Sequence, residues 1–394
     1  MTSEWRTIRA ADFIDFNPRL SLKKGDIATK VAMDKLKPFT KKIPETEKAE
    51  FNGGAKFCNG DTVMARITPC LENGKTAYVD MLGDGEIGFG STEFIVMRAK
   101  TGISDPQFVY YTAINPVFRN VAIKSMVGSS GRQRVQQSVL EELELSVPDL
   151  DEQRRIGDFL ARIDEKIALN DRINDNLEQQ AQSYFQELFV DNADPEWAIG
   201  TISDLGTIVG GSTPSKAKPE YYTESGIAWI TPKDLSINKS KFVSHGENDI
   251  TELGLKNSSA AIMPEGTVLF SSRAPIGYIA IAAGEVTTNQ GFKSVVPKPE
   301  IGTPFVYFFL KNTLPVIEGM ASGSTFKEVS GSTMKNVPAV IPDAETLAKF
   351  SDFCAPIFAQ QRILEEQNQS LATLRDNLLP KLMSGEIDVS AVQL

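Results

Sequence analysis

Residues 151–189 constrain the fold of this chain more than any other stretch. The segment contains no proline and a single glycine, Gly157. Its apolar and small polar residues fall at alternating spacings of four and three, which is the seam of a coiled coil, apolar at both ends and polar in the middle. A helix of this length would extend about 58 Å, and its apolar stripe needs a partner. The seam residues are Ile156, Leu160, Ile163, Ile167, Asn170, Asn174, Leu177, Ala181, Tyr184 and Leu188.

The partner is a second stretch of the same kind, residues 346–383. A shift of 194 residues superimposes the two, and Asn174 then falls on Asn368. A buried Asn in such a seam fixes register at some cost in stability. We expect the helices to pack through Ile156, Leu160, Ile163, Leu177, Leu188, Ile357, Leu371 and Leu382. The chain is therefore divided into block 1–150, helix 151–194, block 195–343, and helix with tail 344–394.

The blocks repeat as well. Asn59–Met64 is echoed by Pro264–Leu269, and the segment Arg66–Pro69 has its counterpart in Ser271–Pro275. Ser91–Phe94 corresponds to Asn289–Phe292, and the loop Val127–Gln133 to Ala321–Lys327. The framework keeps its order while the loops gain and lose residues, which favours two recognition modules with different targets. Duplication without functional divergence is the alternative.

Composition excludes several classes of protein. No apolar run is long enough to span a membrane, and the N-terminal residues lack the apolar core of a signal peptide. Three cysteines without a C-x-x-C favour a reducing, cytoplasmic location and argue against structural zinc. His245 is the only histidine, and no nucleophile is apparent near it. We therefore expect neither catalytic residues nor a metal site.

The net charge of −10 at first argues against a nucleic-acid partner. Its distribution reverses that argument, since residues 151–194 hold 11 Asp and Glu against 5 Lys and Arg, whereas residues 1–150 hold 19 against 20. The blocks can thus carry local basic patches. One candidate is the lysine-rich stretch Leu22–Lys56, for which a solvated loop is the simpler alternative.

Two short motifs imitate catalytic ones. Gly83–Gly88 fits G-x-G-x-x-G, but a strand-like segment follows where a dinucleotide site needs a helix, so a hairpin loop is favoured. Asn115–Phe118, NPVF, resembles the tetrapeptide of adenine methyltransferases, but it follows the expected helix Pro106–Ile114 rather than a strand. A turn at a helix end is the better interpretation.

Two variable blocks, each followed by one of two similar long helices, resemble the specificity (S) subunit of type I restriction–modification systems. The resemblance covers essentially the whole chain and is most specific at Val147–Leu160 and Ile341–Cys354, with further likeness at Ser271–Gly277, Thr288–Phe292, Ser322–Lys327 and Leu382–Ile387. It implies an α+β fold: two β-rich α/β target-recognition domains separated by two long antiparallel helices, which form a coiled-coil spacer with pseudo-two-fold symmetry.

The resemblance also implies a function. Each block would read one half of a bipartite site in double-stranded DNA, and the helices would set the gap and dock two methyltransferase (M) subunits. Those partners would bring S-adenosylmethionine, and restriction (R) subunits would use ATP and Mg²⁺, so this chain itself would bind no cofactor.

Phosphate contacts position a protein on DNA, and base contacts give specificity. For the phosphate contacts we expect Lys23, Lys24, Lys41, Lys42, Lys216, Lys233 and Lys327. For the bases we expect Arg66, Arg132, Gln133, Arg134, Arg273, Asn289 and Gln290, because Arg suits guanine and Asn or Gln suits adenine in the major groove.

Two other functions stay open. A protein-binding scaffold, with two β-rich modules on a coiled coil, would account for the acidic net charge but not for polar loops at matching places in both blocks. A self-contained methyltransferase would have to bind S-adenosylmethionine by itself.

Overall fold

The computed structural model describes residues 5–323 and 327–389. The chain divides into two compact units, here called unit 1 (Met1–Asn170 with Gln367–Leu394) and unit 2 (Asp171–Glu366). Both boundaries fall inside long helices, because each half of a helix packs on the block nearest to it. Each compact unit therefore combines one block with the helix halves that pack on it. The four-part division into blocks and helices stays a prediction.

The two long helices form as expected from the proline-free seam. Helix α5 spans Leu150–Gln186 and continues into a π-helical turn, η2 (Glu187–Asp191), and α11 spans Ala344–Leu382. Asp149 and Asp343, which are 194 residues apart, accept hydrogen bonds from the first-turn amides of Glu152 and Thr346, both at 2.9 Å. The caps repeat along with the helices, and they satisfy amides that a helix start leaves without partners.

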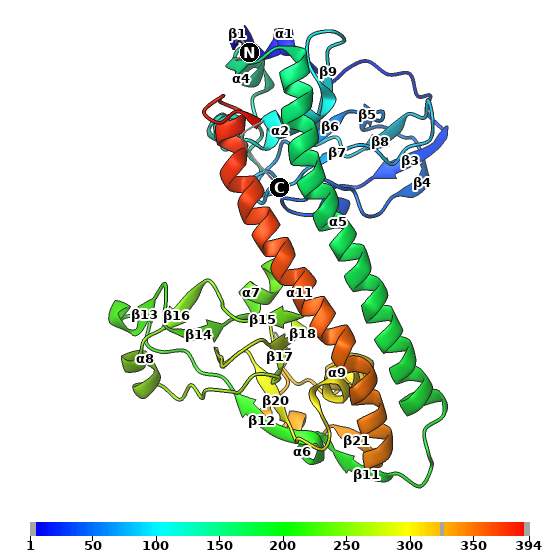
Figure 1. The fold of residues 1–394 in the computed structure, drawn as a ribbon, viewed down its shortest axis with the longest axis vertical. Coiled ribbons are helices and arrows are strands. Elements are labelled where there is room, and N and C mark those ends of the chain that lie inside the picture. The colour runs from blue at the N-terminus through cyan, green and yellow to red at the C-terminus, as the bar shows by residue number, and fades with distance from the viewer. Residues whose placement is uncertain (1–4, 324–326, 390–394) are drawn as a thin grey trace. The chain divides into compact units, whose positions relative to one another are not determined.

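Unit 1 builds its core between a sheet of strand order β2-β9-β6-β7 and the helix α2, with a further sheet of order β4-β3-β8-β5 (Figure 1). The expected helix Pro106–Ile114 is confirmed as α2, and it buries Phe108, Tyr110 and Tyr111. The elements are β1 (Arg6–Arg9), α1 (Ala10–Phe13), β2 (Ile14–Phe16), β3 (Ile27–Val31), η1 (Met33–Lys35), β4 (Glu47–Glu50), β5 (Ala55–Phe57), β6 (Thr62–Ala65), β7 (Thr76–Tyr78), β8 (Gly88–Gly90), β9 (Phe94–Ala99), α2 (Pro106–Ile114), α3 (Pro116–Lys124), α4 (Gln137–Glu141) and β10 (Glu144–Val147).

Unit 2 repeats this plan with a sheet of order β12-β20-β17-β18-β15, helix α9 and a further sheet of order β13-β16-β14-β19. The elements are β11 (Ala198–Thr201), α6 (Ile202–Leu205), β12 (Gly206–Gly210), η3 (Pro219–Tyr221), β13 (Tyr222–Thr223), β14 (Ile227–Ile230), α7 (Pro232–Ile237), β15 (Phe242–Val243), β16 (Asn248–Ile250), α8 (Glu252–Lys256), β17 (Val268–Ser272), β18 (Ile276–Ala282), β19 (Thr287–Thr288), β20 (Lys293–Pro297), α9 (Thr303–Gly319), α10 (Gly331–Lys335) and β21 (Pro338–Ile341).

A two-stranded antiparallel ribbon closes each block immediately before its long helix. In unit 1, β1 pairs with β10 in the register Arg6 to Val147. In unit 2, β11 pairs with β21 in the register Ala198 to Ile341. The first and last strands of each block thus meet, and the chain passes from the ribbon directly into the next helix.

The long helices contact each other in both units and run antiparallel. In unit 1 Asp164 of α5 pairs with Arg375 of α11, and Asn170 donates to the side-chain oxygen of Asn368 at 2.9 Å. In unit 2 the side chain of Gln361 donates to the backbone carbonyl of Asn174 at 3.2 Å. Residue numbers rise along one helix as they fall along the other.

The expected packing residues lie in a wider core than that of a two-helix seam. Ile156, Leu160 and Leu382 belong to the core of unit 1, which includes the sheet and α2, and Ile163 is also buried. Ile357 belongs to the core of unit 2, where Leu177 and Leu188 lie partly buried, and Leu371 is half-buried. Each apolar end of the seam therefore packs on a globular block as well as on the other helix.

Both imitative motifs adopt non-catalytic structures. Gly83–Gly88 leads into β8, so no helix follows, and it is not a hairpin loop either, because β7 pairs with β6 while β8 pairs with β3 and β5. Asn115 caps α3 and so forms the expected turn between two helices. Across the described helices, none has the length and apolarity needed to cross a membrane.

Candidate nucleic-acid interface

A set of backbone hydrogen bonds joins three loops at one edge of unit 1. The amide of Arg66, just after β6, donates to the carbonyl of Glu93, and the amide of Val135 donates to the carbonyl of Arg66, both at 2.9 Å. Val127 and Arg134 exchange both of their hydrogen bonds, at 3.0 and 2.9 Å. We call these five residues the recognition frame of unit 1.

Unit 2 contains the same arrangement. The amide of Ser272, at the end of β17, donates to the carbonyl of Gly291 at 2.7 Å, and the amide of Val329 donates to the carbonyl of Ser272 at 3.0 Å. Ser322 and Glu328 exchange both hydrogen bonds, at 3.1 and 2.9 Å. The equivalent positions of the two frames are Arg66 and Ser272, Glu93 and Gly291, Val127 and Ser322, Arg134 and Glu328, and Val135 and Val329.

The turn that enters each frame is also matched. In unit 1 the amide of Glu93 donates to the hydroxyl of Ser91 at 3.1 Å, and in unit 2 the amide of Gly291 donates to the side-chain oxygen of Asn289 at 2.8 Å. A side-chain-to-backbone turn of this kind is a usual function of Ser and Asn in loops. The side chain of Asn289 is therefore partly engaged in shaping its own turn.

Side chains around the unit 1 frame are held by one strong ion pair. The guanidinium of Arg134 contacts the carboxylate of Glu93 through Nε and Nη2, with a shortest distance of 2.6 Å. This hydrogen bond and charge lower the pKa of Glu93 below its ordinary value. Arg132 is exposed beside this pair, whereas Gln133 and Arg66 are half-buried. Arg66 donates to the carbonyl of Val135 at 3.3 Å, so it is partly used to hold the loop.

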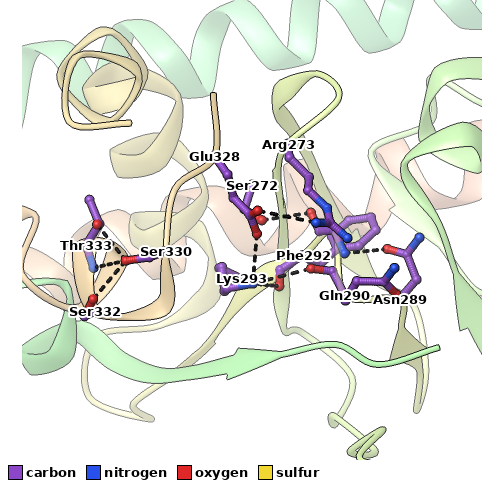
Figure 2. Close-up of polar contacts among 11 residues, drawn as sticks. Ser272, Arg273, Asn289, Gln290, Phe292, Lys293, Glu328, Ser330, Ser332 and Thr333 are labelled. Atoms are coloured by element: carbon purple, nitrogen blue, oxygen red, sulfur yellow. Dashed lines mark hydrogen bonds and ion pairs between the residues drawn. The ribbon is translucent and has the colours of Figure 1, made fainter. Parts of the chain in front are cut away.

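Around the unit 2 frame the charges form a looser cluster. Figure 2 shows Glu328 between Arg273, at 3.4 Å, and Lys293, at 3.9 Å. An open hollow of about 600 Å³ adjoins them and is lined also by Lys327, Pro275 and Glu318. Residues Ser324–Phe326 of the expected loop Ser322–Lys327 lie outside the described residues. The structure thus brings the predicted Arg273 and Lys327 together at one concave site.

Gln290 and Lys216 belong to loops that meet beside this cluster. The hydroxyl of Thr213 donates to the side-chain oxygen of Gln290. The contact depends on Gly211, because a Cβ there would lie 1.9 Å from the carbonyl oxygen of Asn289. Lys216 is exposed farther along the same loop. Lys233 is exposed at the start of α7 and forms an ion pair with Glu247 at 2.5 Å.

The lysine-rich stretch of unit 1 does not converge on the frame. Lys23 and Lys24 are exposed on the loop that precedes β3, and Lys42 pairs with Asp80. The prediction for Lys41 needs correction, since this side chain is only 5% exposed and points into the block, where Gln107 and Tyr111 accept its hydrogen bonds. A lysine run in the sequence does not reveal which of its members turns inward.

Sequence reasoning missed Glu93, Lys293 and Glu328. The expected contacts were Lys, Arg, Asn and Gln side chains, so no carboxylate was among them. The repeat itself carried the signal, since Glu328 aligns with Arg134 at the same offset of 194 that relates the helices. Within the described residues no group of His, Cys, Asp and Glu could hold a metal ion.

Comparison with known proteins decides the family. The model of the family described as "Type I restriction modification DNA specificity domain" matches residues 3–179 and again residues 195–374. The chain belongs to this family. Both matches include one block and most of the helix that follows it, in agreement with the internal repeat. Membership makes the chain a specificity subunit, the non-catalytic component of a type I restriction–modification complex.

Individual relatives agree with this assignment. The HindI specificity subunit of Haemophilus influenzae is 25% identical over 83% of this chain and 86% of its own length. The MjaIX specificity subunit of Methanocaldococcus jannaschii is 38% identical over 47% of this chain, and the aligned stretch covers 45% of that relative. A crystal structure of a type I S subunit from M. genitalium matches 96% of both chains with a TM-score of 0.56 at 17% identity, which supports the fold.

Proposed function

We propose that each unit of this S subunit reads one half of a bipartite site in double-stranded DNA. Arg66, Arg132, Gln133 and Arg134 would contact one half, and Arg273, Asn289 and Gln290 the other. Lys23, Lys24 and Lys42 in unit 1, and Lys216, Lys233 and Lys327 in unit 2, would contact phosphates. Lys41 is left out because it is buried.

The observation that carries this proposal is the pair of matched frames. Their backbone hydrogen bonds coincide position by position, whereas the side chains that they present differ in size and charge. A scaffold that is kept while its polar side chains change is what two readers of different base sequences require. A surface that bound the same partner twice would be expected to keep its side chains too.

The long helices would serve as the spacer and as the dock for two M subunits. Each helix is continuous across a unit boundary, from Leu150 to Gln186 and from Ala344 to Leu382, and is hydrogen-bonded to the other in each unit. The M subunits would carry S-adenosylmethionine, and R subunits would use ATP and Mg²⁺. A DNA-reading role would also place the chain in the cytoplasm.

The test is the methylation pattern of a host that expresses variant S subunits with their M subunit. Arg273→Ala should relax or abolish the half-site read by unit 2, by about 1–3 kcal/mol at the contacted base pair, and leave the other half unchanged. Arg132→Ala should do the reverse. Lys256→Ala, exposed at the end of α8, is the control. If each variant altered both halves together, reading unit by unit would be refuted.

The spacer role has its own test. Four residues inserted within Gln179–Gln182, with a matching insertion in α11, add about one helical turn to the pair. The methylated sites should then show a longer gap between unchanged half-sites. An unchanged gap would show that the helices do not set the distance between the half-sites.

A salt-dependent gel shift separates DNA reading from the scaffold alternative. Binding to the target by the complex with M subunits should weaken steeply as salt rises, because Lys and Arg release counterions from the phosphates. A protein-binding scaffold would give no shift at any salt concentration. Binding of S-adenosylmethionine by the isolated chain would instead favour a self-contained methyltransferase.

A further inference from the structure

One position of the recognition frame carries opposite charges in the two units. Arg134 and Glu328 occupy it, each exchanging both backbone hydrogen bonds with the neighbouring loop, at Val127 and Ser322 respectively. This exchange fixes the backbone at both residues. The side chains of Arg134 and Glu328 therefore leave their frames at equivalent points and in the same direction. The difference between the units at this point is therefore one of side-chain chemistry alone.

The two side chains are held to different degrees. Arg134 forms several contacts of 2.6–3.1 Å with Glu93, which fixes the plane of its guanidinium. Glu328 lies 3.4 Å from Arg273 and 3.9 Å from Lys293, longer than the roughly 2.7–2.9 Å of strong charge-assisted hydrogen bonds. An ionised carboxylate has about four acceptor positions. Glu328 thus keeps acceptor capacity toward the hollow that it lines.

A carboxylate on a DNA-facing surface needs a reason, because phosphates repel it. Arg273 and Lys327 line the hollow together with Glu318 and Glu328, and Lys293 lies 3.9 Å from Glu328, so three cations stand against two acids around this cluster. The site can therefore approach a phosphate backbone and still offer an acceptor. In the major groove, an acidic side chain accepts a hydrogen bond from the amino group of cytosine, whereas Arg donates to guanine.

We propose that the frame position shared by Arg134 and Glu328 reads a base in each half-site, selecting guanine in unit 1 and cytosine in unit 2. Glu93 positions the guanidinium of Arg134, and Arg273 with Lys293 orients the carboxylate of Glu328. The inference rests on the proposed function and adds the identity of the reading position and of the base class. The alternative is that both ion pairs only hold loops together.

The deciding variant is Glu328→Gln, which preserves size and an acceptor for Arg273 but adds an amide donor. Gln favours adenine. Methylome sequencing should therefore show one position of the unit 2 half-site changing from cytosine toward adenine, with the original site methylated about 5- to 100-fold more slowly. The unit 1 half-site should stay as it was. Glu328→Asp should retain cytosine at a reduced rate.

The matched variant is Arg134→Gln, which should change guanine toward adenine at one position of the other half-site. Thermal unfolding of both variants checks that the chain folds. If Glu328→Gln lowered methylation at every site equally and left the base preference unchanged, Glu328 would be a loop-holding residue and the inference would be overturned. Should Arg273→Ala still shift the unit 2 half-site in that case, the proposed function would survive. Half-sites unaffected by every variant would overturn both.

Discussion

Both units bury a lysine against the long helices, and they stabilise it differently. Lys41 in unit 1 and Lys241 in unit 2 are 5% and 7% exposed, and aromatic rings surround each ammonium group. Burying a charge is costly unless it is paired and hydrogen-bonded. The same architecture therefore stabilises a buried lysine in two ways, with a carboxylate partner in one unit and without one in the other.

Lys41 has no carboxylate among its hydrogen-bond partners. Its ammonium donates to Gln107 and, at 3.3 Å, to the hydroxyl of Tyr111. Asp164, the acid whose charge attracts Lys41 most strongly, accepts hydrogen bonds from Tyr111 at 2.6 Å and Arg375 at 2.7 Å. Burial outweighs the attraction of Asp164 and lowers the pKa of Lys41 to about 8.

Lys241 is paired directly. Its ammonium lies 2.5 Å from the carboxylate of Glu178 on α5 and donates to Gln361 on α11 at 2.7 Å. Glu178 also accepts hydrogen bonds from Tyr307 and Lys311. Burial by itself would raise the pKa of Glu178, but the two lysines outweigh it and hold that pKa below its ordinary value. Unit 2 thus ties its block to both helices through one carboxylate.

Among these predictions, Glu178→Ala should lower the free energy of unfolding the most. The substitution leaves Lys241 buried without its counter-ion, which typically costs about 3–5 kcal/mol. Hydrogen exchange read separately over each unit should show the loss in unit 2, with unit 1 unchanged. Asp175→Ala, on the exposed face of the same helix, is the control. A loss below about 1 kcal/mol would mean that Gln361 and the aromatic rings suffice for Lys241.

Lys41→Met should have a smaller effect that depends on pH. Between the folded pKa of about 8 and the ordinary value of 10.5, the unfolded state binds more protons than the folded state, so stability rises with pH in this window. The rise should amount to at most about 3 kcal/mol and should be absent from Lys41→Met. At pH 7 the variant should be as stable as the wild type or more so.

The measurement is the urea denaturation of both proteins at several pH values from 7 to about 10.5, the ordinary pKa of lysine. Lys42→Met, adjacent but half-exposed, is the control and should leave the rise in place. A pH dependence identical in wild type and Lys41→Met would contradict the assignment to Lys41.

The smallest change in the free energy of unfolding is expected from substitutions where α5 and α11 meet in unit 1. Asn170 is fully buried, and its side-chain oxygen lacks a hydrogen-bond partner, while its amide donates to Asn368. Replacing both residues with Leu should raise the free energy of unfolding by about 1 kcal/mol and weaken the register. Urea denaturation checks this, with exposed Asn176→Leu as the control. Destabilisation of the double variant would show that the Asn pair contributes net stability.

Several features followed from the sequence because they depend on local patterns. The absence of proline and the spacing of four and three predict α5 to within a few residues, and Asp105 followed by Pro106 marks the start of α2. The same offset of 194 relates the two caps, Asp149 and Asp343, although only the structure identifies them as caps. The family resemblance came from the same repeat and is confirmed.

What the sequence determined is thus the plan of the chain: two blocks, two long helices and a duplicated order of elements, all of which are set by periodicity and spacing. The tertiary structure decided which side chains meet. It turned Lys41 inward, joined Asn170 rather than Asn174 to Asn368, and placed Glu328 between Arg273 and Lys293. Such pairings join residues far apart in the chain, and their energies depend on burial and distance, which no local pattern records.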